Sequence, residues 1–252
     1  MRVVSGQAKG RRLKSPRTAG TRPILDRVKT ALFDILSTRV EDARFLDLFA
    51  GTGGVGIEAL SRGAASATFI ELNAGVLKLV RENLQITGLA EGAETLHTDA
   101  FKFLQAHAGE RRLAGNQGTH PQGAMNGGPT INRGPTPFNL TPKGARKNRL
   151  DIPPDDDSSR RMDRIPYDIV YVAPPQYKGM AARALELLDS SPLVADTGLV
   201  IIQIFPKERD EVAAVALSRL ALVDERRYGS TLLLFYEANK EGSSHVDTIT
   251  EA

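Results

Sequence analysis

Short apolar segments alternate with amphipathic segments through most of this chain. From residue 45 onward, runs of four to seven residues rich in valine, isoleucine, leucine and phenylalanine are followed by stretches in which apolar positions recur every three or four residues. The short runs predict buried strands, and the longer repeats predict helices. The expected strands are residues 45–49, 67–71, 94–97, 168–172, 199–205, 220–225 and 231–236.

A first helix is expected near Asp26, a residue type that caps helix N-termini, because Val28, Leu32, Ile35 and Leu36 then follow at helical spacing. Further helices are expected over residues 55–62, 74–87, 100–106, 180–188 and 208–220.

The alternation of strands and helices predicts an α/β fold with a mostly parallel, doubly wound sheet and helices on both of its faces. The last two expected strands are joined only by residues 226–230, a link too short for a crossover helix. These two strands are therefore expected to be antiparallel.

One long segment does not fit the alternation. Residues 114–137 contain six glycines and four prolines among 24 positions, and a basic run and an acidic run follow. We interpret residues 109–165 as a disordered insertion between the third and fourth strands, either without function or in contact with RNA. The expected organisation is a basic segment over residues 1–30, one domain over residues 31–240 interrupted by this insertion, and a flexible tail over residues 241–252.

The composition narrows the class of protein. There is no cysteine, and the four histidines lack the spacing of metal ligands, so no metal site is expected. The longest apolar run, residues 199–205, is interrupted by Gln203 and is far shorter than the roughly 20 residues of a membrane helix. The N-terminus has no apolar signal core, and its glycines and prolines argue against a transit peptide. A cytoplasmic monomer is expected.

Positive charge is concentrated at the N-terminus. Residues 1–30 carry nine lysines and arginines and one acid, which gives +8, so the remaining chain carries 3 − 8 = −5. A basic arm on an acidic body is typical of a protein that binds a polyanion, whereas the simpler interpretation is a tail that aids solubility. We expect RNA phosphates to be contacted by Arg2, Lys9, Arg11, Arg12, Lys14, Arg22 and Arg27.

A glycine-rich turn follows the first expected strand. Residues 45–56 read FLDLFAGTGGVG, in which Gly51, Gly53 and Gly56 have the G-x-G-x-x-G spacing of nucleotide-binding loops. Glycine allows a close backbone approach to a ligand. Taken alone, this motif fits NAD as well as S-adenosylmethionine.

Two acids follow the next two strands. Glu71 lies twenty residues after Gly51, where an acid can accept hydrogen bonds from both ribose hydroxyls. Asp99 could hold the adenine amino group, with Phe101 packed on the ring, or it could simply cap the following helix. Their succession after the glycine turn favours cofactor binding.

A rigid turn follows the fourth expected strand, with the sequence Ala173-Pro174-Pro175-Gln176-Tyr177. Its prolines would aim backbone carbonyls at a base amine, and the tyrosine would stack on the base. An ordinary proline turn at the end of a strand is the alternative. A dehydrogenase has no need of this turn.

The chain resembles the bacterial 16S rRNA (guanine-N2)-methyltransferase family, a family of class I enzymes that use S-adenosylmethionine. The resemblance lies in residues 1–6 (MRVVSG), 9–13 (KGRRL), 21–23 (TRP), 26–29 (DRVK), 46–53 (LDLFAGTG) and 56–64 (GIEALSRGA). It covers most of the chain outside residues 109–165 and the tail after Asn239. The N-terminal block is the more specific part, because many methyltransferases share the other motifs.

The resemblance implies a Rossmann-like sheet of seven strands and methyl transfer to the N2 amine of a guanine in 16S rRNA, either naked or in an assembling small subunit. It implies a target-amine motif at Ala173, Pro174, Pro175, Gln176 and Tyr177. It also implies that Thr21 and Arg22 close over the cofactor or base. The expected cofactor-binding residues are Thr21, Asp47, Phe49, Ala50, Gly51, Thr52, Gly53, Glu71, Asn73, Asp99 and Ala100.

The target-amine motif departs from the family pattern, which has Asp or Asn, then Pro-Pro-Tyr. Here Ala173 replaces the acid or amide, and Gln176 separates Pro175 from Tyr177. Three explanations are open: Gln176 supplies the missing acceptor, a backbone carbonyl suffices, or the protein binds RNA without methylating it. An adenine-N6 methyltransferase of DNA or RNA is a further alternative.

Overall fold

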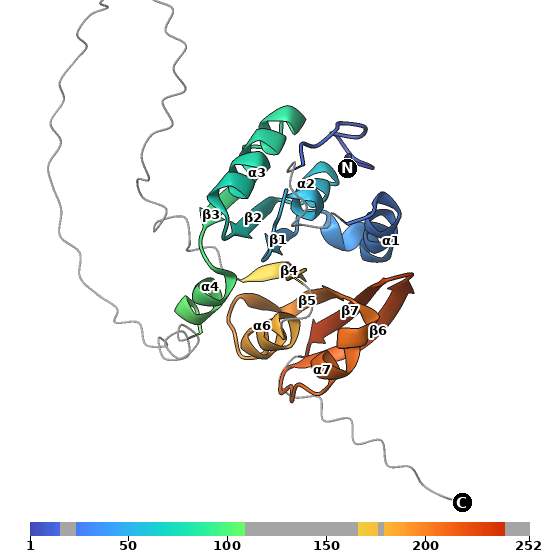
Figure 1. Cartoon of the computed structure of the whole chain (residues 1–252), viewed down its shortest axis with the longest axis vertical. Helices are drawn as coiled ribbons and strands as arrows, with labels where there is room; N and C mark the ends of the chain where they lie inside the picture. The colour runs from blue at the N-terminus through green and yellow to red at the C-terminus, as the bar shows by residue number, and fades with distance from the viewer. Residues whose placement is uncertain (16–23, 109–165, 176–178, 240–252) are drawn as a thin grey trace, which may run out of the picture. The chain divides into compact units, whose positions relative to one another are not determined.

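A single seven-stranded sheet forms the centre of the computed structural model, which describes residues 1–15, 24–108, 166–175 and 179–239. The strand order is β3-β2-β1-β4-β5-β7-β6, and β7 alone runs antiparallel to the other six strands (Figure 1). This arrangement confirms the predicted α/β sheet and its antiparallel last pair. The strands are β1 (Arg44–Asp47), β2 (Ser66–Glu71), β3 (Ala93–His97), β4 (Tyr167–Val172), β5 (Val194–Ile204), β6 (Leu220–Tyr228) and β7 (Thr231–Ala238).

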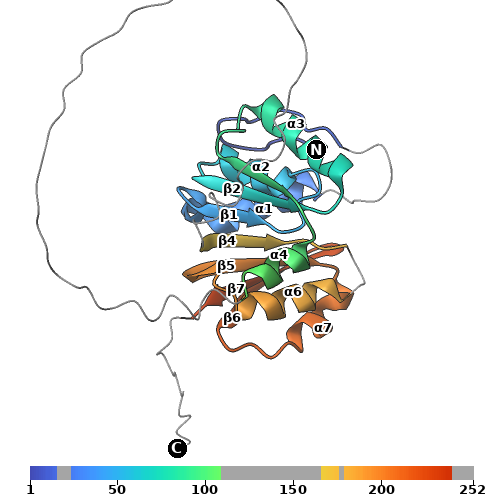
Figure 2. The ribbon, with the colours of Figure 1, turned by 90° about the vertical axis from the view of Figure 1, so that its left-hand side faces the viewer.

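Helices cover both faces of the sheet. Figure 2 shows α4, α6 and α7 on one face, with α1, α2 and α3 behind the sheet. The core is apolar on both sides of the central strands, with Phe45, Leu46 and Val170 wholly buried. The helices are α1 (Asp26–Leu36), α2 (Gly54–Ser61), α3 (Ala74–Thr87), α4 (Ala100–Ala106), α6 (Met180–Asp189) and α7 (Arg209–Ala213), with short 3-10 turns η1 (Ser37–Val40) and η3 (Pro206–Glu208).

The helix predicted over residues 208–220 is wrong in its second half, because α7 ends at Ala213. The carboxylate of Asp189 accepts hydrogen bonds from the backbone N–H groups of Ser218, Arg219 and Leu220, at 2.7–2.9 Å. Asp189 is distant in the sequence, and its carboxylate binds the N–H groups that would otherwise form the hydrogen bonds of a helix.

Two smaller boundaries also differ from the prediction. Asp26 is the first residue of α1 and not its N-cap, since Leu25 occupies the cap position. Strand β5 begins at Val194, five residues before the predicted start. Its early part is fixed by the Arg219 guanidinium, which donates to the carbonyls of Val194 and Ala195.

Several predictions lie outside the described residues. They concern the insertion at residues 109–165, the tail at residues 241–252, the upstream pair Thr21 and Arg22, and the two residues Gln176 and Tyr177. They stay predictions.

Residues 1–15 form a feature that we call the N-terminal hairpin. Its two arms pair through an antiparallel bridge between Arg2 and Arg12, and the Val3 N–H donates to the Arg11 carbonyl at 2.9 Å. Val3, Ala8 and Leu13 are buried in the main core cluster. The predicted basic arm is therefore folded onto the domain through its apolar positions, at least as far as Ser15.

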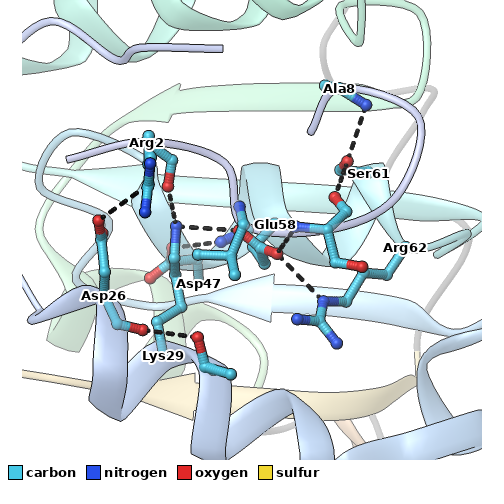
Figure 3. Close-up of polar contacts among 12 residues, drawn as sticks. Arg2, Ala8, Asp26, Lys29, Asp47, Glu58, Ser61 and Arg62 are labelled. Atoms are coloured by element: carbon cyan, nitrogen blue, oxygen red, sulfur yellow. Dashed lines mark hydrogen bonds and ion pairs between the residues drawn. The ribbon is translucent and has the colours of Figure 1, made fainter. Parts of the chain in front are cut away.

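A buried carboxylate, Glu58 of α2, holds this hairpin in place (Figure 3). It accepts hydrogen bonds from the backbone N–H groups of Val4 and Ser5, both at 2.8 Å. It also forms ion pairs with Lys29 at 2.9 Å and Arg62 at 3.1 Å. Because a buried charge is costly without such partners, the hairpin, α1 and α2 are tied to one another.

The turn of the hairpin lies against the end of α2. Ser61 accepts a hydrogen bond from the Ala8 N–H at 3.0 Å and donates to the Ser5 carbonyl at 2.6 Å (Figure 3). Gly6 has φ of +78°, and a Cβ there would overlap the Ser61 carbonyl oxygen. Gly10 has φ of +84°, but open space surrounds its missing Cβ.

These two glycines generate a matched prediction. Gly6→Ala should detach the hairpin, because the left-handed backbone and the overlap with Ser61 must both be relieved. Gly10→Ala should cost only about 1 kcal/mol, the strain of a left-handed alanine. Urea unfolding and limited proteolysis with N-terminal sequencing measure both effects. Equal stability and equal protease resistance in the two variants would contradict this account of the hairpin.

Candidate active site at the carboxyl edge of the sheet

The residues predicted for the site gather at one edge of the sheet. Asp47 ends β1, Glu71 ends β2, and Asp99 follows β3 by two residues. The Ala173–Pro175 segment follows β4, which pairs with the other side of β1. The chain thus switches from one side of β1 to the other between β3 and β4. Open parallel sheets bind ligands at such a switch point.

The glycine turn has the backbone geometry that its sequence predicts. Gly51 and Gly53 have φ of +55° and +78°, in the region that favours glycine. A Cβ at Gly51 would meet nothing within 4 Å, so this side of the turn is open. A Cβ at Gly56, by contrast, would overlap the ring of Phe69 on β2. The third glycine therefore allows α2 to pack closely on the sheet.

Glu71 is joined to the glycine turn. Its carboxylate accepts hydrogen bonds from the Gly51 N–H at 3.0 Å and from the Asn73 N–H at 2.8 Å. Each oxygen keeps acceptor capacity for a further donor. Asn73 caps α3 by accepting a hydrogen bond from the Val76 N–H. Leu72, which lies between Glu71 and Asn73 in the chain, is 65% exposed. An exposed leucine beside an open glycine turn offers apolar surface to a ligand ring.

Asp99 caps α4 in this structure. Its Oδ1 atom accepts hydrogen bonds from the backbone N–H groups of Phe101 and Lys102, at 2.9 and 3.0 Å. Capping is thus observed, and both bonds fall on one oxygen. The Phe101 ring is 8% exposed and lies under the Arg183 guanidinium, 4.5 Å from the ring centroid. Adenine would reach that ring face only if Arg183 moved.

Asp47 is the most perturbed acid at this edge. Its Oδ2 atom accepts a hydrogen bond from the Gly56 N–H at 3.1 Å, while Oδ1 has no hydrogen-bond partner among the described residues. Burial raises the pKa of Asp47 to about 7, with a smaller contribution from the charge of Glu71, against the lowering effect of the Gly56 bond. A buried carboxylate oxygen without a partner is a place where a ligand donor would be stabilised.

Tyr171 lies beside Asp47, because the two residues pair between β1 and β4. Burial and the charge of Asp47 raise the pKa of the tyrosine hydroxyl well above its ordinary value. The neutral hydroxyl donates to Gln203 at the end of β5, at 2.6 Å. This contact joins β4 and β5 next to the Ala173–Pro175 segment.

The target-amine motif is described only in part. Pro174 is buried, Ala173 is half-buried against the main core cluster, and Pro175 is exposed. The segment therefore leaves the sheet on the side of β1 opposite to Glu71 and Asp99.

The predicted RNA-binding residues lie on the surface. All those in the described residues are exposed, although Arg2 forms an ion pair with Asp26 at 3.6 Å and Lys14 forms one with Glu82 at 2.7 Å. The backbone of Lys14 is held by Asn83, which also donates to the Thr52 carbonyl of the glycine turn at 3.0 Å. The exposed residues are Arg2, Lys9, Arg11, Arg12, Lys14 and Arg27.

Sequence reasoning missed the residues that connect these parts. Asn83 joins the hairpin to the glycine turn, and the Glu58–Lys29 pair joins the hairpin to α1. The sequence did offer a signal for these residues. Each is a charged or amide residue at a core-facing position of a helical repeat, and such a residue must find buried partners.

In the part of the chain that the structure describes, no helix is long and apolar enough to cross a membrane. The same residues contain no cluster of three or more histidine, aspartate or glutamate side chains able to hold a metal ion.

The Asp47 pKa gives a prediction for stability. Its pKa in the folded protein, about 7, lies above the ordinary 3.8, so its favourable contribution is complete below pH 3.8 and is lost as the pH rises to about 7. Asp47→Asn keeps an acceptor for Gly56 but does not titrate. The difference in unfolding free energy between the variant and wild type should therefore shift in favour of the variant by at most roughly 3–4 kcal/mol as the pH rises from 4 to 8. Urea unfolding across this range measures the gain, and a constant difference would contradict the shifted pKa.

Comparison with known proteins places this fold in a family. Residues 1–113 and 154–237 match the family described as Conserved hypothetical protein 95. Ribosomal RNA small subunit methyltransferase D of Escherichia coli K12 is 27% identical over 247 residues, which cover 98% of this chain and 94% of that protein. The putative rRNA methyltransferase YlbH of Bacillus subtilis is 41% identical over 118 residues, which cover 47% of this chain and 63% of that protein.

A solved structure supports the same grouping. The structure of the putative methyltransferase yhhF from Escherichia coli has a TM-score of 0.63 and 26% identity, and the match covers 95% of this chain and 98% of that one. A TM-score of 0.63 over nearly the full length of both chains shows that the two share one fold. The chain therefore has the class I methyltransferase fold and belongs to the family described as Conserved hypothetical protein 95.

Proposed function

We propose that this protein is a methyltransferase that uses S-adenosylmethionine and methylates the exocyclic N2 amine of a guanine in 16S rRNA. The observation that carries the proposal is the buried Asp47, with one carboxylate oxygen lacking a partner among the described residues, beside an open glycine turn at the switch point of the sheet. The names of the two curated relatives, both rRNA methyltransferases, support RNA as the substrate. The proposed setting is the cytoplasm, and the proposed form is a monomer.

The residues at this edge fit S-adenosylmethionine. Asp47, whose Oδ1 atom has no partner among the described residues, would hold the cofactor, and Glu71, with one hydrogen bond to each oxygen, would use its remaining acceptor capacity for the ribose hydroxyls. The turn from Phe49 to Gly53 provides the close backbone approach. Asn73, Asp99 and Ala100 lie at the ends of α3 and α4, where the adenine would be placed, and Thr21 would close the site.

When bound, S-adenosylmethionine supplies a methyl group made electrophilic by its sulfonium. The protein's own task is to place the guanine amine in line with that group, about 3 Å away. Carbonyls of Ala173 and Pro174 accept the amine N–H groups, so that the nitrogen lone pair points to the methyl carbon. The amine would exchange one of its hydrogens for the methyl group, its proton would pass to water, and S-adenosylhomocysteine would be the second product. Gln176 adds an acceptor, Pro175 stiffens the turn, and Tyr177 stacks on the base.

Ala173 supports a second candidate, a factor that binds rRNA without methylating it. Alanine lacks the side-chain acceptor that the family pattern has at this position. Asp47 favours the enzyme, because its Oδ1 atom has no partner among the described residues and a ligand donor at the switch point would stabilise it. An adenine-N6 enzyme would use the same turn, so the modified nucleoside distinguishes it.

The proposed activity has a direct test. Calorimetry should detect binding of S-adenosylhomocysteine but not of NAD. Tritium should then pass from labelled S-adenosylmethionine to 16S rRNA, and mass spectrometry of the digested RNA should find N2-methylguanosine. Methyladenosine would overturn the guanine assignment. Binding of S-adenosylhomocysteine and RNA without transfer would favour the binding factor.

Three variants test the altered motif. Gln176→Ala should lower single-turnover methylation about 100-fold with nearly unchanged cofactor affinity, because the lost contact is to the reacting amine. Ala173→Asp should preserve or raise the rate, and Tyr177→Ala should weaken both RNA binding and turnover. If Gln176→Ala is fully active, the backbone carbonyls alone orient the amine. Activity that appears only in Ala173→Asp would identify the natural protein as a binding factor.

A further inference from the structure

The turn between β6 and β7 lies at the same edge of the sheet as the candidate site. Leu232 at the start of β7 pairs with Ile204 at the end of β5, and Tyr228 at the end of β6 pairs with Thr231. Because β5 is parallel to β4, its end and the end of β4 share one edge. Adjacent strands are about 4.8 Å apart, so β7 and β6 lie about 10 and 15 Å from the end of β4.

The end of β6 that leads into this turn carries two exposed arginines, Arg226 and Arg227, and we call residues 226–230 together the β6–β7 turn. The Arg226 side chain is 56% exposed and is oriented by an ion pair with Asp224 at 2.9 Å. Arg227 donates from Nε to the Gly229 carbonyl at 3.3 Å, which directs its guanidinium along the turn. Tyr228 packs against the main core cluster and anchors the turn.

The turn also meets the start of α1. Gly229 has φ of +61°, and a Cβ there would lie 3.5 Å from an Nη atom of Arg27. The residue before Arg27, Asp26, pairs with Arg2 of the N-terminal hairpin. Arg2 and Arg27 therefore lie beside the β6–β7 turn, on the face of the sheet that α1 covers. Arg226 is on the same face, because it pairs with Leu233 of the main core cluster, whereas Arg227 is on the opposite face.

The net charge at this end of the sheet is positive. Arg2, Arg27, Arg226 and Arg227 outnumber the two acids Asp26 and Asp224, which gives 4 − 2 = +2. The neighbouring Arg209 forms ion pairs with Glu225 at 3.0 Å and with Asp210 at 3.7 Å, so this adjacent group of three carries −1. Outside residues 1–30 the chain carries −5, so the two turn arginines stand on an acidic background.

We propose that the β6–β7 turn is a second phosphate-binding surface for the RNA substrate, continuous with the basic N-terminal residues. The inference rests on the proposed function and extends it to Arg226 and Arg227. Guanidinium groups bind phosphate oxygens with two parallel hydrogen bonds. At 10–15 Å from the end of β4, estimated from strand spacing, the turn holds nucleotides that flank the target and not the target base itself.

The test compares wild type with three variants in binding to fluorescently labelled, transcribed 16S rRNA at several salt concentrations. Arg226→Ala/Arg227→Ala should bind about tenfold more weakly, and the slope of log affinity against log salt should fall by about 1.4–1.8 units for two lost phosphate contacts. Asp224→Asn removes the charged partner of Arg226 and keeps both arginines, so it should retain or raise the affinity, which excludes an effect of breaking the Arg226–Asp224 pair. Arg39→Ala is the matched control, since Arg39 is an exposed arginine just beyond the far end of α1.

The outcomes separate this inference from the function on which it rests. If wild type neither binds nor methylates 16S rRNA, the proposed function fails. If wild type does both and the double alanine variant matches Arg39→Ala, the turn is not an RNA surface and the inference alone fails. If the double alanine variant loses affinity only for assembled subunits, the turn contacts a ribosomal protein and the inference is again overturned. Unchanged affinity for S-adenosylhomocysteine verifies that the variants are folded.

Discussion

The buried carboxylate of Glu58 is the interaction on which the placement of the basic surface depends. It is fully buried, and its stability requires Lys29, Arg62 and the N–H groups of Val4 and Ser5 at the same time. Removal of any one partner would leave buried charge or a buried donor uncompensated, which costs several kcal/mol. The hairpin and α1 therefore cannot move independently of α2, and the arginines they carry keep fixed positions relative to the glycine turn.

Comparison of Glu58 with Asp47 distinguishes a structural acid from one that faces a ligand. Both are buried, and both lie in or beside the glycine-rich segment. Glu58 has partners on both oxygens, whereas Asp47 has one backbone partner, one oxygen without a partner among the described residues, and a pKa of about 7. Asp26 Oδ1 is also buried without a partner among the described residues, so the case for a ligand at Asp47 rests on its position beside the open glycine turn at the switch point of the sheet.

Local sequence pattern was sufficient for the parts of the protein that local interactions determine. Strand periodicity and the G-x-G-x-x-G spacing predicted the sheet, and Gly51 and Gly53 have the expected backbone geometry. The pattern failed after Ala213, where Asp189, about thirty residues away, binds the N–H groups of residues 218–220. It also missed Arg226, because only the strand register shows that this charged residue lies at the same edge of the sheet as the candidate site. Asp99 was ambiguous, because capping and ligand binding require the same residue type at the same place.

The order of the strands places acidic residues on one side of the candidate site and arginines on the other, as the proposed reaction requires. Asp47, Glu71 and Asp99 follow β1, β2 and β3 on one side of the switch point, whereas Arg226 and Arg227 lie beyond β4 on the other. Acids suit a cationic sulfonium and ribose hydroxyls, but they repel phosphates. In the proposed complex, RNA phosphates would be bound on both sides of these acids, by the β6–β7 turn and by the N-terminal hairpin, whose Lys14 is joined to the glycine turn through Asn83. An uncharged base turned out of the strand would avoid this repulsion and could reach the acidic ends of β1–β3. The order of the strands, more than any one residue, would then let the base and the cofactor meet at the end of β4.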